Sequence, residues 1–203
     1  MADFSLEREQ LELGYRSICG VDEVGRGALF GPVVAGAVIL DPENLDNRIR
    51  DSKRLSPRRR RELAVWIYAN APAWSIGWCD NEDIDRVNIL EATRIAMKRA
   101  VSGLQIPPDY VLIDGMEPDF MPVRGAGILH GDDRSLSVAA ASIIAKVYRD
   151  ELIVRMSRWF PQYELDSNKG YPSARHVRAL EEHGATLFHR RTFRTVKWQL
   201  RKG

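Results

Sequence analysis

Short apolar runs and longer stretches with apolar residues at helical spacing follow one another along this chain. Continuous apolar runs over Ile18–Val21 and Val33–Leu40 predict two strands, joined by a turn that contains several glycines. The stretch Ala73–Cys79, rich in Trp and Ile, predicts a third strand. The short apolar run Tyr110–Ile113 predicts a buried strand, and Gly127–Leu129 predicts a further strand-like piece.

Helices are predicted where apolar residues recur three or four positions apart behind a capping residue. The clearest start is Ser56 followed by Pro57, because serine is a good N-cap and proline fits the first helical position. The predicted helices begin or extend as follows: from Ser56, from Asp80, over Ile89–Ser102, from Ser135 to a point before Pro161, and over about 173–183. Strands that alternate with helices indicate an α/β fold.

The composition is that of an ordinary globular protein. The chain has 203 residues, of which 44% are hydrophobic and 29% are charged, and this is enough to bury one substantial core. We therefore expect a single domain over residues 1–203. Neither an internal repeat nor a low-complexity linker divides it.

Two features of the sequence predict a cytoplasmic protein that neither crosses nor enters a membrane. No run of about 18 apolar residues occurs, and the first residues carry acids instead of a basic region followed by an apolar core. Cys19 and Cys79 lie far apart and outside any paired cysteine motif. This usage fits a reducing compartment and argues against a structural zinc site.

The charges are segregated along the chain. The segment 48–61 has eight Lys or Arg and one acid, and the segment 169–203 has nine and two, so each carries a formal charge of +7. Because the whole chain carries +2, the remainder is strongly acidic. This distribution suits a basic cradle for a polyanion around an acidic centre. A single charged run is more often a solvated helix face.

Carboxylates stand where two of the predicted strands end. Asp22 and Glu23 follow the first strand, and Asp114 follows the strand 110–113. Acids in such places are costly to desolvate unless a cation or hydrogen bonds compensate them. In open α/β sheets, sites gather at the carboxyl ends of strands, so Asp22 and Asp114 meet there if their strands are neighbours. The alternative is a hairpin whose acids merely face water.

Glycines surround a basic residue directly after the first acids. Gly25, Gly27 and Gly31 allow the main chain to turn with positive φ or to approach a ligand closely, and Arg26 offers a forked cation to a phosphate. With Asp132, which precedes the helix that starts at Ser135, these residues complete a candidate site for chemistry on a phosphodiester.

Asp22, Glu23, Asp114 and Asp132 form a set of hard oxygen ligands. Two divalent ions held by such ligands can activate a water and stabilise a leaving oxygen, and carboxylates suit Mg²⁺ or Mn²⁺ better than zinc. Other chemistries lack their motifs. The histidines do not form a His-Glu-x-x-His pair, no Gly-x-Ser-x-Gly elbow occurs, and the P-loop pattern is missing.

Several segments together resemble bacterial ribonuclease HII, the type 2 ribonuclease H family. They follow one another from about residue 18 to 195: GVDEVGRG at 20–27, DSK at 51–53, LIDG at 112–115, GD at 131–132, SVAAASIIAKV at 137–147 and KGYP at 169–172. The resemblance implies a ribonuclease-H-like α/β fold with a mixed five-stranded sheet flanked by helices. It places the core at about 16–160 and a helical C-terminal extension at about 161–203.

The resemblance also implies an activity and its cofactor. The family cuts the RNA strand of RNA·DNA hybrids and incises 5′ to single ribonucleotides in duplex DNA, leaving 3′-hydroxyl and 5′-phosphate ends with Mg²⁺ or Mn²⁺. Asp22, Glu23, Asp114 and Asp132 correspond to its catalytic and metal-binding acids. We expect hybrids and ribonucleotide-containing duplex DNA as partners, and a monomer.

The same resemblance assigns the substrate-binding residues. Gly25, Arg26 and Gly27 would sense the 2′-hydroxyl and the flanking phosphates, Tyr171 would stack on the sugar of the following deoxynucleotide, and Lys53 would hold a backbone phosphate. The physical reading agrees, because glycine-flanked amides can approach a 2′-hydroxyl where side chains would clash. Taken alone, Tyr171 is equally a packed turn residue and Lys53 a solvated lysine.

Some alternatives stay open at the level of sequence. Asp133 adjoins Asp132, and the family pattern favours Asp132 as the ligand. His130 stands where the family usually has lysine, which would add pH dependence near neutrality. A DNA-directed nuclease such as a junction resolvase would need the same acids without a ribose sensor. A hybrid-binding protein without activity would use only the basic segments.

Overall fold

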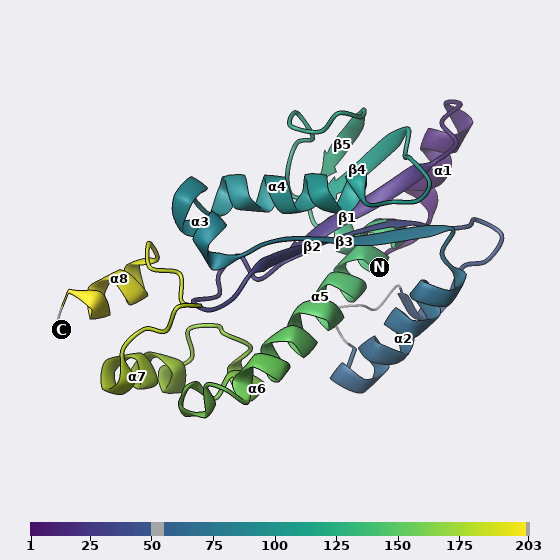
Figure 1. Cartoon of the computed structure of the whole chain (residues 1–203). Helices are drawn as coiled ribbons and strands as arrows, with labels where there is room; N and C mark the ends of the chain where they lie inside the picture. The colour runs from purple at the N-terminus through teal and green to yellow at the C-terminus, as the bar shows by residue number, and fades with distance from the viewer. Residues whose placement is uncertain (50–54, 202–203) are drawn as a thin grey trace.

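The computed structural model describes residues 1–49 and 55–201, and its strands form one five-stranded sheet with helices on both faces (Figure 1). The strands are β1 (Ile18–Val24), β2 (Val33–Ile39), β3 (Ala73–Cys79), β4 (Tyr110–Asp114) and β5 (Gly125–Ile128). The helices are α1 (Ser5–Glu12), α2 (Pro57–Asn70), α3 (Asn81–Val87), α4 (Ile89–Ser102), α5 (Leu136–Ser157), α6 (Leu165–Asn168), α7 (Ala174–His183) and α8 (Arg194–Leu200), with short 3₁₀ turns η2 (Gly131–Asp133) and η3 (Pro161–Tyr163).

The sheet is mixed, in the order β3-β2-β1-β4-β5. β1 runs antiparallel to β2 and parallel to β4, so the predicted adjacency of the two strands that carry carboxylates is confirmed. Val21 pairs with Ile113, and the next position of this register sets Asp22 level with Asp114. The fifth strand begins earlier than the predicted 127–129, because Gly125 and Ala126, which carry little apolar signal, pair with β4.

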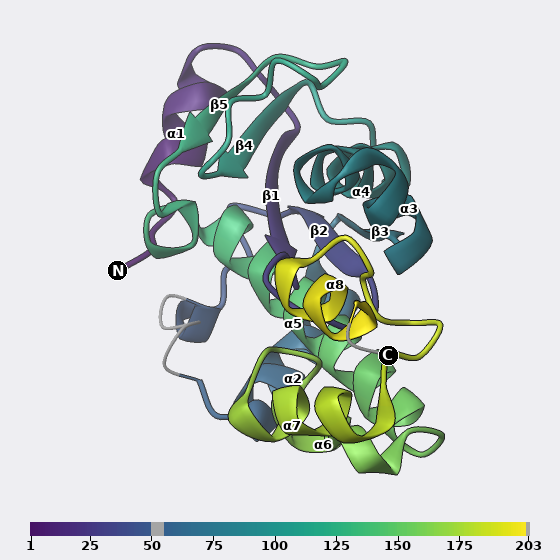
Figure 2. The ribbon, with the colours of Figure 1, turned by 90° about the vertical axis from the view of Figure 1, so that its left-hand side faces the viewer.

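Helices cover the two faces of the sheet differently. Figures 1 and 2 show α3 and α4 on one face and α2 and α5 on the other. The predicted starts are confirmed: Ser56, Asp80 and Ser135 each accept a hydrogen bond from a main-chain N–H in the first turn of the helix that follows. Gly36, opposite Asp22, leaves room for α5, since a Cβ there would lie 2.4 Å from the carbonyl oxygen of Ala141.

The last forty or so residues pack on the C-terminal half of α5. Figures 1 and 2 show α6 and α7 beside this half, at the opposite end of the molecule from α1. They bury their own apolar cluster, and this cluster also takes in Leu29 and Phe30 from the turn between β1 and β2. The turn that follows the acids is therefore built partly on the C-terminal extension.

The N-terminal helix α1 has no counterpart in the predicted pattern. It carries a buried acid, Glu7, whose carboxylate accepts hydrogen bonds from the Ser135 hydroxyl at 2.5 Å and the Ser137 N–H at 2.8 Å. Glu7 thereby joins α1 to the start of α5. Among the described helices, none is long and apolar enough to cross a membrane.

Candidate active site

The carboxylates predicted from the sequence converge at one end of the sheet. Asp22 and Glu23 lie near the C-terminal end of the strand β1, and Asp114 is the last residue of the neighbouring strand β4. Asp132 lies in η2, immediately before α5. The Gly131 N–H donates to Asp114 Oδ1 at 2.6 Å, which ties the segment that carries Asp132 to the end of β4. Strand register and one main-chain hydrogen bond thus bring three distant parts of the chain together.

Burial separates Asp132 from its neighbour. Asp132 is 7% exposed, close to the 6% of Asp22, whereas Asp133 is exposed to solvent. A buried carboxylate needs a cation or hydrogen bonds, while an exposed one is satisfied by water. The burial of Asp132 therefore favours it over Asp133 as a member of the site.

The pKa of Asp22 is raised well above its usual value of 3.8, chiefly because burial penalises the charged form. The neighbouring charges of Glu23 and Asp114 raise it further, while a hydrogen bond from Ser142 on α5 opposes the shift. Burial also raises the pKa of Glu23, against the lowering effect of Arg26. Like charges held together in a partly dry site leave a deficit of positive charge.

This donor set suits a divalent cation in its chemistry. Glu23 Oε2 is buried and has no hydrogen-bond partner among the described atoms, so one hard oxygen is available to a ligand. Across residues 1–49 and 55–201, no three Asp, Glu, His or Cys side chains gather closely enough to hold an ion as they stand. The backbone brings the acids to the same end of the sheet.

Arg26 is engaged by the acids in this structure. Its Nη1 donates to Glu23 Oε1 at 3.0 Å, and its side chain is 47% exposed. The guanidinium end of the pair is open to solvent, whereas the Glu23 side chain is only 12% exposed. The position of Arg26 beside Glu23 is compatible with a later contact to a phosphate.

The two glycines that flank Arg26 differ in their surroundings. Gly25 has φ +93°, and a Cβ there would lie 2.2 Å from Nε of Arg149. Gly27 has no atom within 4 Å of a built Cβ and is exposed. The protein itself therefore requires glycine at position 25, while position 27 faces open space into which a ligand can come.

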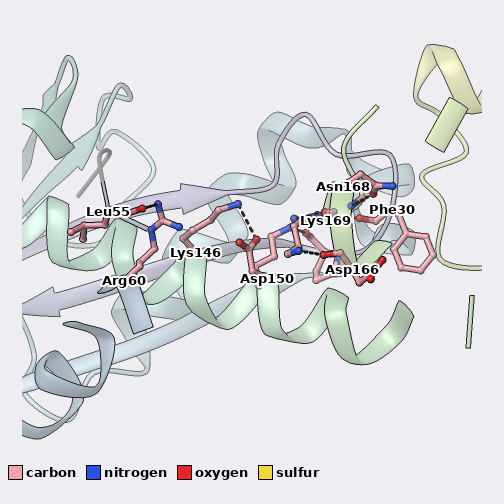
Figure 3. A network of polar contacts seen from close by, with 11 residues as sticks. Phe30, Leu55, Arg60, Lys146, Asp150, Asp166, Asn168 and Lys169 are labelled. Carbon is pink, nitrogen blue, oxygen red and sulfur yellow. Dashed lines mark hydrogen bonds and ion pairs between the residues drawn. The ribbon is translucent and has the colours of Figure 1, made fainter. Parts of the chain in front are cut away.

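Tyr171 lies on the loop that follows α6, half-buried beside α5. The cations of Lys146 and Arg149 lie over its ring, at 5.6 Å and 5.3 Å from the ring centre. Lys146 also pairs with Asp150 at 2.9 Å, a contact that Figure 3 shows along α5. The Leu29 N–H donates to Gly170 O at 2.8 Å. This bond holds the Tyr171 loop beside the turn between β1 and β2, residues 25–32, which we call the glycine turn.

Lys53 lies outside the described residues, so its predicted phosphate contact has no structural account. The described part of the same basic segment begins the helix α2, where Ser56 caps the first turn. Arg60, in this first turn, donates to the main-chain carbonyl of Leu55 at 3.0 Å (Figure 3).

Sequence reasoning missed residues of the site that come from α5 and the extension. Ser142 and Arg149 lie on α5, and Arg190 precedes α8. Ser142 stands in a run of small residues that indicated only close packing. Nothing in the local pattern marks the two arginines as buried, since Lys and Arg are mostly exposed.

The histidines are divided between solvent and core. His176 and His189 are fully buried, with their Nε2 atoms 3.1 Å apart. His176 Nδ1 lies 2.9 Å from the carbonyl oxygen of Tyr171. This pair supports the Tyr171 loop from behind, as expected of structural histidines, whereas His130 is exposed.

Comparison with known proteins gives a consistent result. The sequence profile of the family described as Ribonuclease HII matches residues 19–196. Ribonuclease HII from Trichormus variabilis (strain ATCC 29413 / PCC 7937) is 52% identical over 188 residues, which cover 90% of this chain and 84% of that protein.

Solved structures share the fold. The ribonuclease H2 from Pyrococcus horikoshii OT3 superposes with a TM-score of 0.79 at 27% identity, covering 92% of this chain and 98% of that chain. Bst-RNase HIII, solved in complex with Mn²⁺, has a TM-score of 0.72 at 22% identity, with 95% of this chain and 71% of that chain covered. The second likeness concerns the fold alone.

Proposed function

We propose that this chain, which belongs to the ribonuclease HII family, cuts duplex DNA on the 5′ side of single embedded ribonucleotides. The coarser activity follows from the family: the protein is a divalent-metal-dependent ribonuclease H that acts on RNA·DNA hybrids. The proposal is more specific than this family activity. It states which phosphodiester bond is cut and that the products carry 3′-hydroxyl and 5′-phosphate ends. The observation that supports it best is the convergence of Asp22, Glu23 and Asp114 beside a turn in which Arg26 and Gly27 are exposed.

Asp22, Glu23, Asp114 and Asp132 would hold the metal, and all four are the catalytic residues of the proposal. When bound, a pair of Mg²⁺ or Mn²⁺ ions supplies activation of a water and stabilisation of the leaving oxygen. Burial, with the neighbouring charges of Glu23 and Asp114, raises the pKa of Asp22, and this supports the assignment because a bound cation would stabilise the charged carboxylate. Ser142 keeps the Asp22 carboxylate oriented through its hydrogen bond.

The choice of sugar would fall to the glycine turn and Tyr171. Main-chain groups at Gly25, Arg26 and Gly27 can come close to a 2′-hydroxyl, since Gly27 leaves the approach open. The ring of Tyr171 would pack on the next sugar, where a deoxyribose fits and a ribose adds a hydroxyl. Lys53 would bind a backbone phosphate near the start of α2.

Several further proposals follow from the sequence. We propose one domain over residues 1–203, a core at about 16–160 with its extension at about 161–203, and a monomer as the working unit. We also propose a cytoplasmic location, supported by two buried free thiols, Cys19 and Cys79.

The test compares three end-labelled duplexes that are identical except for their sugars: one ribonucleotide in DNA, a continuous RNA strand on DNA, and all DNA. With Mg²⁺ or Mn²⁺, we expect a cut 5′ to the single ribonucleotide, none in the all-DNA duplex, and none with EDTA. Asp22→Asn should abolish cleavage while binding to the duplex persists. Asp133→Asn, an exposed neighbour, is the matched control and should retain activity.

Other outcomes would contradict the proposal. Cleavage of branched all-DNA substrates would identify a resolvase. Binding to hybrids that is unchanged by EDTA, with no cut under any condition, would identify a binding protein. Full activity of Asp22→Asn would remove that carboxylate from the mechanism.

A further inference from the structure

Two arginines are completely buried where the glycine turn, the Tyr171 loop and the C-terminal extension meet. Arg149 and Arg190 have no exposed surface and are the largest fully buried side chains among the described residues. Burial lowers the pKa of both, and the nearby charge of Arg149 contributes to lowering that of Arg190, to about 9. Burying two like charges costs free energy, which hydrogen bonds to the guanidinium groups must offset.

The hydrogen bonds of Arg149 join two loops. Its Nε donates to Pro32 O at 3.0 Å and its Nη2 to Phe30 O at 3.1 Å, both in the turn between β1 and β2. Its Nη1 donates to Lys169 O at 2.9 Å, at the start of the Tyr171 loop. Figure 3 shows Phe30 and Lys169 close together beside α5. One rigid guanidinium therefore spans both segments that would contact the sugars.

Arg190, from the extension, holds the glycine turn alone. Its Nη1 donates to Arg26 O at 2.9 Å, inside the glycine turn, and its Nε donates to Gly31 O at 2.9 Å. The main-chain N–H of Arg190 donates to Leu29 O at 2.8 Å. The guanidinium also lies over the ring of Phe193, 5.1 Å from the ring centre. The residue that would sense the sugar, Arg26, is thus held at its carbonyl by a residue more than 160 positions away.

Steric contacts reinforce this arrangement. A Cβ on Gly25 would overlap the Arg149 side chain, and one on Gly170 would lie 2.9 Å from Phe30 O. Gly25 is therefore packed against Arg149, and Gly170 against the Phe30 carbonyl that Arg149 binds, at distances that only glycine permits. A shift of the Arg149 guanidinium would disturb both loops, and a shift of Arg190 would disturb the glycine turn.

We propose that Arg149 and Arg190 are positioning residues that determine specificity by fixing the glycine turn in register with Tyr171. This inference rests on the proposed function, since the register matters only where a ribose must be followed by a deoxyribose. A continuous RNA strand offers a 2′-hydroxyl at every step and so needs this register less. A misplacement of about 1 Å in such a site can cost about 100-fold in rate.

The test uses Arg190→Lys and Arg149→Lys, because lysine keeps the positive charge but cannot hold two carbonyls in a fixed fork. We expect kcat/KM on the one-ribose duplex to fall about 10- to 100-fold, and on the continuous hybrid about threefold or less. The ratio between the two substrates should therefore change, mainly through kcat. A loss of folded protein alone would lower both rates equally and leave the ratio as it was.

The matched control is Tyr163→Phe. Tyr163 lies in the same buried cluster, and its hydroxyl donates to Gly184 O at 2.7 Å, so the change removes a hydrogen bond to neither loop and leaves the ring in place. This variant should lose stability but keep the substrate ratio. If a lysine variant does not fold, Phe193→Leu removes only the ring beneath Arg190 and should shift the ratio in the same direction by a smaller factor.

A second readout is independent of activity. Hydrogen exchange of the peptide that covers residues 25–32 should be faster in Arg190→Lys than in the wild type, and unchanged in Tyr163→Phe. A substrate ratio that stays constant in all variants, or unchanged exchange of this peptide, would overturn the inference. If the wild type does not cut the one-ribose duplex, the proposed function fails, and the exchange result still decides whether Arg190 holds the turn.

Discussion

Two regions of this molecule bury like charges, and they solve the problem in opposite ways. At the ends of β1 and β4, carboxylates repel one another, and Glu23 Oε2 has no hydrogen-bond partner among the described atoms. At Arg149 and Arg190, five main-chain carbonyls accept hydrogen bonds from the two cations. The first region leaves a carboxylate oxygen open to a cation, while in the second the protein's own carbonyls bind the two guanidinium groups, and only Arg190 Nη2 has no partner among the described atoms.

The difference indicates which charges serve ligands and which serve structure. A buried group whose hydrogen-bonding capacity is used by the protein fixes loops in place. A buried charged group that lacks enough hydrogen-bond or ion partners raises the free energy of the folded state, and a bound ligand can compensate it. Substitutions in the two regions should therefore change the free energy of unfolding in opposite directions.

The largest expected effect is the loss of an arginine. Arg149→Ala leaves the carbonyls of Phe30, Pro32 and Lys169 without their donor, and should lower the free energy of unfolding by about 3–5 kcal/mol. Urea denaturation measures this value. The exposed Arg175→Ala, which loses only its ion pair with Glu164, is the control and should leave the free energy of unfolding close to the wild-type value.

A smaller effect should separate the two glycines of the turn. Gly25→Ala places a Cβ at positive φ against Arg149, and should cost about 2–4 kcal/mol of stability. Gly27→Ala meets no protein atom, so its stability should match the wild type within about 0.5 kcal/mol. Its kcat/KM on the one-ribose duplex should nevertheless fall. Unchanged cleavage by Gly27→Ala would show that no ligand approaches this turn closely.

The histidine pair predicts a dependence of stability on pH. Burial lowers the pKa of His176 below 6.5 and, together with the nearby His176, lowers that of His189 to about 3. Below pH 6.5 the unfolded chain binds protons that the folded protein does not, so stability falls as the pH decreases. For His189 the slope approaches about 1.4 kcal/mol per pH unit well below pH 6.5, and His176 adds to it in the same direction. Urea titrations at pH 7, 6 and 5 measure it, and His189→Gln should flatten the curve.

The smallest expected change is a gain. Because burial and the charges of Glu23 and Asp114 raise the pKa of Asp22, the charged form is disfavoured in the folded protein, and stability is lost as the pH rises through that raised value. Asp22→Asn removes the charge and should raise the stability at pH 7. Thermal unfolding without added metal measures it. A destabilised Asp22→Asn would mean that the acids already have sufficient partners.

The local pattern of the sequence predicted most of the fold. Strands with continuous apolar runs, such as Val33–Ile39, and helices with a capping serine, such as Ser56 and Ser135, were placed correctly because their signals are local. The start of β5 was placed late, since Gly125 pairs through its main chain alone. The helix α1 was missed because its role, to bring Glu7 to the start of α5, depends on tertiary contacts.

The sequence predicted the acids of the candidate site but not its buried arginines. The acids could be identified because charge at the end of an apolar strand is unusual, and strand pairing then brought Asp22 to Asp114. The arginines could not be identified, since only the packing of the extension on α5 reveals that Arg190 reaches Arg26. Roles assigned by resemblance to Lys53 and Tyr171 stay predictions.

The central claim is that the carboxylates at the ends of β1 and β4 form a site for divalent cations. Calorimetric titration of Mn²⁺ into the wild type, Asp114→Asn and the exposed control Asp133→Asn tests it most directly. The account predicts saturable binding to the wild type and to Asp133→Asn, and binding weakened at least tenfold in Asp114→Asn. Equal affinity in all three proteins would contradict it.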